Sequence, residues 1–134
     1  MRELKRKPRI LFSRYTLDGH DRGLLTVMHR CRNAGMEVIY IHFNDVQEIT
    51  QTAVQEDVDV IGVTCSMGQH FSVMTELLRL LRENNYGIPV IMGGVIPTVD
   101  VLRLLEMGVK GVFGPGSSPE EAVKAISEFV GKEI

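Results

Sequence analysis

Apolar and polar positions along the chain follow two alternating patterns, and each pattern occurs five times. In five short runs, rich in Val and Ile, most positions are apolar: residues 9–13, 36–41, 58–64, 88–92 and 111–113. Such runs are typical of strands in a parallel sheet that is covered on both faces. The pattern therefore predicts five largely buried strands over these residues.

Between these runs, apolar residues recur at steps of three and four positions, as on the buried face of an amphipathic helix. Gly35 follows the first helical segment and Gly108 the fourth, where glycine commonly ends a helix. Pro97 precedes the fourth segment, and Ser118 and Pro119 precede the fifth. The residues that we expect to face the core are Leu24, Val27, Met28 and Cys31; Ile49, Ala53 and Val54; Phe71, Met74, Leu77, Leu78 and Leu81; Val101, Leu102 and Leu105; and Ala122, Ala125, Ile126 and Phe129.

Five strands that alternate with five helices require a parallel sheet with right-handed crossovers. The sequence therefore predicts an α/β fold: a doubly wound, five-stranded parallel sheet of the flavodoxin-like order 2-1-3-4-5. We expect a tail over residues 1–8 and one domain over residues 9–134. In this fold ligands bind at the carboxyl ends of the strands, where the winding direction changes. Functional residues are therefore expected just after Ser13 and Thr64.

The composition excludes several classes of protein. Hydrophobic residues make up 44% of the 134 residues and charged residues 24%, which is typical of a globular domain. The net charge of −2 gives no basic excess for binding nucleic acid or a membrane surface, and no apolar run is long enough to span a bilayer. The two cysteines, Cys31 and Cys65, are not spaced as metal ligands, so we expect packed thiols and a cytoplasmic protein.

The loop after the first strand contains a histidine two residues beyond an aspartate. Asp18 can accept a hydrogen bond from one ring nitrogen of His20 and leave the other as a metal donor. Gly19 permits a sharp turn, and Gly23 permits close approach to something bulky. The pattern is equally compatible with a helix-capping aspartate beside an exposed loop histidine, and both interpretations remain open from spacing alone.

The loops after strands three, four and five are rich in small residues. Residues 64–66 (Thr-Cys-Ser) place hydroxyl groups after strand three, although they also fit a simple loop into a helix. His70 follows, and we expect it to be exposed and without a role. Residues 93–94 are a glycine pair, and residues 114–118 lead into the last helix, whose free N–H groups suit a phosphate. Together these loops predict a long slot for a flat ligand.

These segments resemble a known family. Residues 18–23 match the D-x-H-x-x-G signature of cobalamin-binding domains. Residues 60–70, 93–97 and 112–116 are similar to the C-terminal cobalamin domain of methylmalonyl-CoA mutase. The resemblance covers about residues 8 to 131, with the motifs in the order and spacing of the family. It implies that the slot binds cobalamin.

The resemblance also implies how the cofactor is held. Adenosylcobalamin would bind base-off, with its dimethylbenzimidazole tail buried in the slot and His20 ligating the cobalt ion. Asp18 would accept a hydrogen bond from the other ring nitrogen of His20, and Arg14 would stand where the family usually has lysine. Thr64 would offer a hydroxyl to the buried base. The residues that the resemblance assigns to the cofactor are Arg14, Asp18, Gly19, His20, Asp21, Arg22, Gly23, Thr64, Ser66, Gly93, Gly94, Gly116 and Ser117.

Two segments depart from the family pattern. Ser66 replaces the leucine of the family's S-x-L motif, which removes an apolar wall from the base pocket. Tyr15 and Thr16 replace smaller residues in the first loop, near the expected lower face of the corrin. Neither change removes the cobalt ligand or its aspartate, so cobalamin binding is still expected, with altered packing around the tail.

The function that the resemblance implies is that of a cobalamin-binding small subunit of an adenosylcobalamin-dependent acyl-CoA mutase, which is an isomerase. The substrate barrel of such enzymes needs roughly 250 residues. The chain is therefore expected to act with a separate large acyl-CoA-binding subunit, as a hetero-oligomer, with no catalytic residue independent of the cofactor. A mostly apolar exposed patch is expected around His20, where that subunit covers the corrin.

Three other interpretations remain. A corrinoid carrier for methyl transfer shares the D-x-H-x-x-G signature but normally has a helical cap domain before it, and only about eight residues precede the first strand here. A cobalamin sensor or delivery module needs no barrel partner. A flavodoxin-like domain without corrinoid is disfavoured, because a receiver domain needs a phosphorylatable aspartate where Thr64 to Ser66 stand.

Overall fold

Five parallel strands alternate with five helices in the computed structural model. The structure describes residues 7–15, 22–65, 68–114 and 116–131. The elements are β1 (Arg9–Tyr15), α1 (Arg22–Asn33), β2 (Glu37–Phe43), α2 (Val46–Gln55), β3 (Val60–Cys65), α3 (His70–Glu83), β4 (Val90–Gly94), α4 (Thr98–Met107), β5 (Gly111–Phe113) and α5 (Pro119–Val130).

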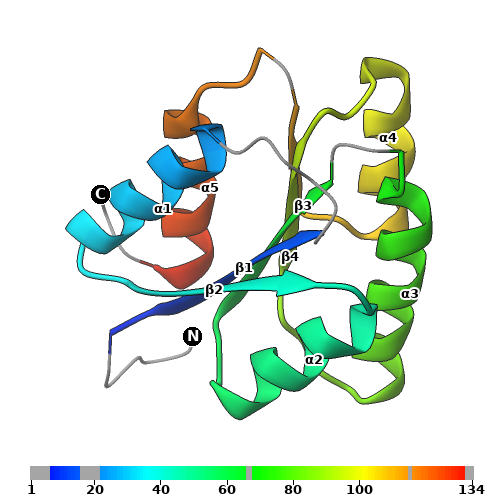
Figure 1. The fold of residues 1–134 in the computed structure, drawn as a ribbon, viewed down its shortest axis with the longest axis horizontal. Helices are drawn as coiled ribbons and strands as arrows, with labels where there is room; N and C mark the ends of the chain where they lie inside the picture. Colours follow the sequence, from blue (N-terminus) through cyan, green and yellow to red (C-terminus); the bar gives the residue numbers. More distant parts are fainter. Residues whose placement is uncertain (1–6, 16–21, 66–67, 115, 132–134) are drawn as a thin grey trace.

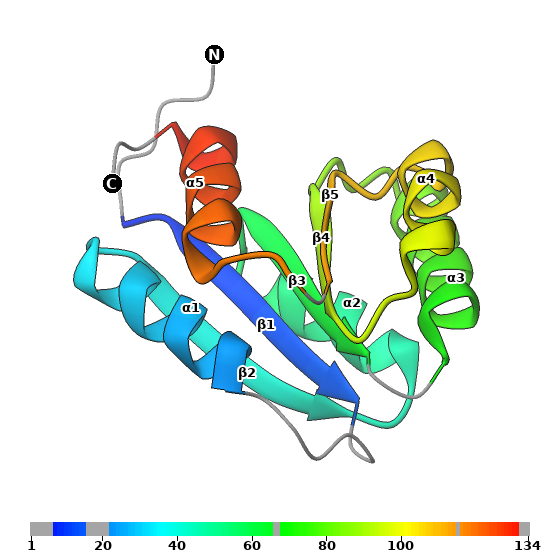
Figure 2. The ribbon, with the colours of Figure 1, turned by 90° about the horizontal axis from the view of Figure 1, so that it is seen from above.

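The strands form one sheet in the order β2-β1-β3-β4-β5, and every neighbouring pair is parallel. Helices α1 and α5 cover one face, whereas α2, α3 and α4 cover the other (Figures 1 and 2). Each face has its own apolar core, one with Ile10, Phe12 and Ile126, the other with Leu11, Met74 and Leu77. The predicted doubly wound, flavodoxin-like fold is confirmed.

Three of the strands extend two residues beyond the predicted ends. β1 reaches Tyr15, β2 reaches Phe43 and β4 reaches Gly94. The extra residues include Arg14 and two glycines, which carry no apolar signal, but the backbone ladder continues through them. The functional edge of the sheet therefore lies slightly beyond the apolar runs.

Several helical residues that were expected in the core are exposed. Leu102 and Leu105 of α4 are exposed, and Leu104 is the buried residue of that helix. The reason is position, because α4 packs beside α3 and β5 at the edge of the sheet, which leaves one side of the helix uncovered. Val54 of α2 and Phe129 of α5 are also exposed.

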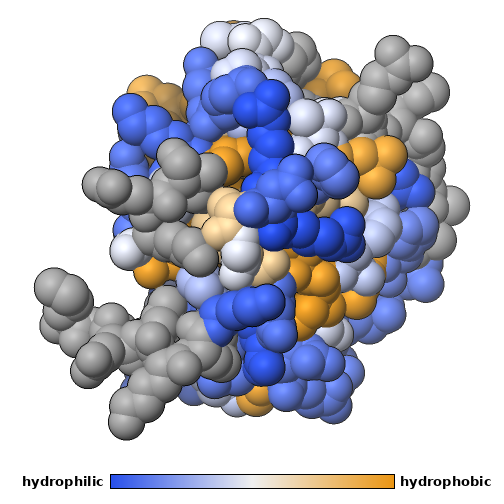
Figure 3. Space-filling model, turned by 90° about the vertical axis from the view of Figure 1, so that its left-hand side faces the viewer, coloured by the Kyte–Doolittle hydropathy of each residue, from blue (hydrophilic) through white to orange (hydrophobic). Residues whose placement is uncertain are grey.

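The outward faces of α1 and α5 are mainly polar. Figure 3 shows this side of the molecule, where polar side chains predominate and apolar ones appear in patches between them. Within the residues that the structure describes, no helix combines the length and apolarity needed to cross a bilayer. Cys31 and Cys65 are both buried thiols, as expected.

Candidate functional site

Two rows of residues run across the carboxyl end of the sheet on the face covered by α1 and α5. The outer row is Arg14, Thr64, Gly93 and Phe113, which are register partners on β1, β3, β4 and β5. The inner row is Phe12, Gly62, Ile91 and Gly111. Because side chains two residues apart share a face, both rows point toward the core that contains Phe12, Ile91 and Phe113.

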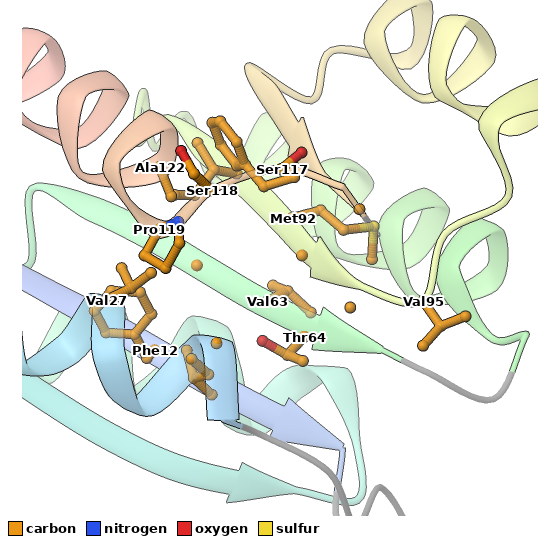
Figure 4. A pocket seen from close by; sticks show the side chains of 18 of the residues that line it. Phe12, Val27, Val63, Thr64, Met92, Val95, Ser117, Ser118, Pro119 and Ala122 are labelled. Atoms are coloured by element: carbon orange, nitrogen blue, oxygen red, sulfur yellow. The ribbon is translucent and has the colours of Figure 1, made fainter.

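A cavity of about 390 Å³ lies over these rows. It lies between α1 and the start of α5, and four strands, β1, β3, β4 and β5, contribute to its floor. Figure 4 shows Val27 of α1 and Pro119 of α5 on facing walls, with Thr64 near the end of β3. The cavity therefore occupies the carboxyl end of the sheet, where the doubly wound fold predicts a ligand.

Three glycines shape the floor of this cavity: two are covered by aromatic rings, and the third leaves open space. A Cβ atom on Gly62 would lie 2.9 Å from the ring of Phe12, and one on Gly111 would lie 2.9 Å from the ring of Phe113. The two aromatic rings thus lie against glycines at opposite sides of the floor. Between them Gly93 has no side chain, and the nearest atom to a Cβ there is the Phe113 carbonyl oxygen at 3.4 Å. The absence of a side chain at Gly93 leaves open space rather than relieving a clash.

Gly94 has a different role from its neighbour. Its φ of +111° lies in the region that favours glycine, and a Cβ atom would lie 2.2 Å from the carbonyl oxygen of Cys65. This glycine is required by the close approach of β4 to the end of β3. The glycine pair therefore combines one position that shapes the cavity with one that shapes the backbone.

The cavity walls are uncharged. All residues that the structure assigns to its lining are neutral, and its side-chain polar groups are the hydroxyls of Thr64, Ser117 and Ser118. The walls thus suit a flat, largely apolar group with few polar atoms, not acid–base chemistry by the lining itself. Within the described part of the chain, no cluster of three His, Cys, Asp or Glu side chains is arranged to hold a metal ion.

The buried thiol of Cys31 does not line the cavity. Cys31 lies on α1, and burial raises its thiol pKa from 9.0 to about 11. The side chain is therefore a neutral, packed thiol at physiological pH.

The structure brings part of the predicted site together. Arg14 lies in the outer row of the sheet without lining the cavity, and Arg22 begins α1. Asp18, Gly19, His20, Asp21 and Ser66 lie outside the described residues, as does the surface expected around His20. The predicted residues that line this one cavity are Gly23, Thr64, Gly93, Gly94, Gly116 and Ser117.

Sequence reasoning missed the apolar walls. Phe12 and Phe113 fall inside predicted strands, but the cavity depends on their register partners on neighbouring strands, Gly62 on β3 and Gly93 on β4. An apolar ring beside an in-register glycine is a signal that becomes visible once strand order and register are known. His70 was also misjudged: it is buried rather than exposed, and it contacts Asp100.

The fold and the cavity define a flavodoxin-like domain with an uncharged cavity at the carboxyl ends of its strands. A model of the B12 binding domain matches residues 8–124. The chain belongs to the B12-binding domain family.

Several characterised proteins are similar to the chain over most of its length. The small subunit of 2-hydroxyisobutanoyl-CoA mutase from Aquincola tertiaricarbonis is 38% identical over 124 residues, which cover 91% of each chain. The small subunit of pivalyl-CoA mutase from Xanthobacter autotrophicus is 37% identical, over 89% of this chain and 81% of the relative. Methylmalonyl-CoA mutase from Cereibacter sphaeroides is 35% identical over 93% of this chain but only 18% of its own.

Solved structures share the fold. A cobalamin-binding protein from Desulfitobacterium hafniense superimposes with a TM-score of 0.77 at 18% identity, over 93% of this chain and 60% of that protein. A response-regulator receiver domain from Mycobacterium tuberculosis gives a TM-score of 0.70 at 16% identity, over 96% and 99% of the two chains. At these identities the likeness concerns the fold alone, which both kinds of protein use.

Proposed function

We propose that this chain is the cobalamin-binding small subunit of an adenosylcobalamin-dependent acyl-CoA mutase. The observation that carries the proposal is the uncharged cavity at the carboxyl end of the sheet, floored by Gly93 between two aromatic rings. Membership of the B12-binding family and similarity to two mutase small subunits over most of their length support it.

The residues present fit the nucleotide tail of cobalamin. A cavity of about 390 Å³ has the size of a small-ligand pocket and is far too small for a whole corrinoid. The dimethylbenzimidazole base would enter between Phe12 and Phe113, with its face over Gly93, and the Thr64 hydroxyl would hydrogen-bond to a ring nitrogen. Gly116 and Ser117, before α5, would adjoin the phosphate and ribose. The corrin ring would then lie outside, at the mouth of the cavity.

The cobalt ligand in this proposal is His20. The D-x-H-x-x-G motif immediately precedes and enters α1, and its last residue, Gly23, lines the cavity. Asp18 would hold the second ring nitrogen of His20 and thereby fix its tautomer, and Arg14, at the end of β1, would supply the cation beside Asp18. Gly19, Asp21 and Arg22 complete this loop, and Ser66 would border the base. When bound, adenosylcobalamin supplies radical chemistry through its weak cobalt–carbon bond.

The partner would be a large subunit that binds the acyl-CoA. Two relatives are named small subunits, and in a methylmalonyl-CoA mutase the matching segment is 18% of the chain. Next to the cavity, Val95, Val99 and Leu102 are 59%, 87% and 67% exposed. Val95 also lines the cavity, so this apolar surface continues from its rim onto α4. We assign it to the large subunit, which would enclose the corrin from this side.

The resulting protein is an isomerase subunit of a cytoplasmic hetero-oligomer that is active only with its partner. Its own contribution is to bind the tail, orient the cofactor and exclude water from the tail. Substrate selection would belong to the large subunit, because the described cavity has the size and polarity of a site for the cofactor tail, not for an acyl-CoA.

An absorption titration with hydroxocobalamin tests the cofactor site. Wild-type protein is expected to bind it base-off with histidine as the lower ligand, whereas His20→Ala should lose that spectral signature and keep its circular dichroism spectrum. Co-purification with a candidate large subunit and adenosylcobalamin, followed by assays over several acyl-CoA thioesters, tests the enzyme. An unchanged cobalamin spectrum and unchanged turnover in His20→Ala would refute the axial role.

A further inference from the structure

A buried histidine joins the first turns of two neighbouring helices. His70 is the first residue of α3 and is only 5% exposed. Its Nε2 lies 2.8 Å from Oδ2 of Asp100, in the first turn of α4. In Figures 1 and 2 these two helices lie side by side on the same face of the sheet. The contact links positions thirty residues apart in the chain.

The surroundings of this pair are tightly organised. The His70 ring lies 4.7 Å from the ring of Phe71, and the guanidinium carbon of Arg103, on α4, lies 4.5 Å from the centre of the Phe71 ring. Nδ1 of His70 is buried and makes no hydrogen bond to any described residue. A buried polar atom without a partner is unfavourable, so packing alone does not account for a histidine here. The hydrogen bond to Asp100 is the specific interaction that the side chain provides.

The segment that leads from Asp100 back to the cavity is short and well fixed. The Asp100 amide donates to the Pro97 carbonyl, and the Ile96 amide donates to the Gly94 carbonyl. The Ile96 side chain is buried. The backbone carbonyl oxygen of Ile96 lies 3.2 Å from the place that a Cβ atom on Gly114 would occupy. A displacement of the start of α4 would therefore be transmitted through residues 94–97 to the cavity wall.

His70, the other member of the pair, lies close in sequence to β3, the strand that pairs with β4. His70 begins α3, the next element after β3, and Cys65 at the end of β3 is the register partner of Gly94. Along the chain, α3 follows β3 and α4 follows β4. The ends of β3 and β4 are thus paired in the sheet, and the hydrogen bond between His70 and Asp100 links the starts of the two helices that follow them.

We propose that His70 and Asp100 are a positioning pair that holds the cavity wall formed by the ends of β3 and β4 in the geometry that binds the cofactor tail. Neither side chain lines the cavity. They act through Gly94 and Val95, which do. The identity of the ligand rests on the proposed function, whereas the mechanical coupling between the helix starts and the wall does not.

The test compares Asp100→Ala, Asp100→Asn and His70→Ala with the double variant. The affinity for hydroxocobalamin is measured by absorption titration, and stability by urea unfolding. We expect each alanine variant to raise Kd about tenfold or more, the double variant to be no worse than the weaker-binding single, and Asp100→Asn, which keeps an acceptor oxygen, to lie within about threefold of wild type. Arg79→Ala, which removes two exposed ion pairs on α3, is the matched control and should leave Kd unchanged.

A merely structural role makes a different prediction. It lowers the urea midpoint but leaves Kd within about threefold in the folded variants, and that result would overturn the proposal. Asp100 is at the surface edge of the pair, so Asp100→Ala keeps the test valid if His70→Ala does not fold.

Hydrogen–deuterium exchange separates failure of this proposal from failure of the proposed function. Without any ligand, Asp100→Ala should accelerate exchange of the amides in residues 94–96 relative to Arg79→Ala. Unchanged exchange there would refute the coupling even in a protein that binds cobalamin. Absence of cobalamin binding by wild type, with accelerated exchange in the variant, would refute the cofactor assignment and retain the coupling.

Discussion

The substitution Gly93→Leu should fill part of the cavity and weaken ligand binding without destabilising the fold. Gly93 is the floor position between the rings of Phe12 and Phe113, and its backbone conformation is one that other residues adopt. Leucine adds four carbon atoms there. At roughly 25–30 Å³ each, close to the volume of a liquid water molecule, they occupy about 100–120 Å³. That is roughly a quarter to a third of the 390 Å³ cavity.

The same geometry gives the expected energies. A Cβ at Gly93 meets its nearest neighbour, the Phe113 carbonyl oxygen, at 3.4 Å, which is ordinary contact. Replacing glycine within a strand gains roughly 0.5–1 kcal/mol, and each newly buried carbon adds at most about 0.8 kcal/mol. The Gly93→Leu variant should therefore be as stable as wild type or more stable by about 1 kcal/mol or more. Because the side chain occupies the place of the base, Kd for hydroxocobalamin should rise at least about a hundredfold, or ~2.7 kcal/mol.

Gly94→Ala is the matched contrast at the next residue. Its Cβ would lie 2.2 Å from the Cys65 carbonyl oxygen at a φ of +111°, so we expect a loss of stability of about 3 kcal/mol or more. Thermal unfolding and cobalamin titration of both variants provide the assay. A Gly93→Leu protein that is folded and binds hydroxocobalamin with wild-type affinity would show that the tail does not enter this cavity.

Three further predictions concern other parts of the molecule. Because burial raises the folded-state pKa of Cys31 from 9.0 to about 11, the unfolded thiol ionises first, and stability is lost as pH rises from 9 to 11. The free energy of unfolding in urea, measured over that pH range, should fall by about 2–3 kcal/mol more in wild type than in Cys31→Ala. Equal pH dependence of the two proteins would contradict this prediction. Leu102→Glu should abolish binding to the large subunit with cobalamin Kd unchanged, whereas Val54→Glu, at an exposed apolar site on α2, should bind normally in the same pull-down. Asp45→Ala removes the N-cap of α2 and should cost about 0.5–2 kcal/mol of unfolding free energy without changing cobalamin Kd.

The order of the strands was predictable because alternation of strands and helices leaves few sheets to choose from, and 2-1-3-4-5 is a common doubly wound order. Five apolar runs separated by amphipathic segments leave few arrangements that bury both faces of a parallel sheet. The strand ends were less predictable, since Arg14 and Gly93 continue the backbone ladder without an apolar side chain. The prediction that Leu102 faces the core was wrong for another reason. Periodicity identifies an apolar stripe on a helix, but not whether the rest of this chain covers that stripe.

The site, like the fold, was predictable from the sequence only in part. Thr64, Gly93 and Gly116 were predictable as small residues at strand ends, and all three line the cavity. The aromatic sides of the floor depend on register across strands, which local patterns do not encode. His70 was misjudged because burial of a polar side chain depends on its partner, and Asp100 lies on the next helix. Pairwise contacts of this kind require the folded chain.

In the sequence, the proposed cobalt ligand His20 stands three residues before Gly23, and this has a consequence for affinity. Gly23 lines the cavity, while residues 18–20 precede it directly in the chain. One corrinoid would be held at two points, so each attachment raises the effective concentration for the other. Gly93→Leu should therefore weaken binding yet retain the histidine-ligated spectrum at saturating cobalamin, whereas His20→Ala should weaken binding and lose that spectrum even at saturation. The double variant should not bind detectably, because no second attachment remains. Equal spectra for the two single variants at saturation would mean that the two sites do not serve the same ligand.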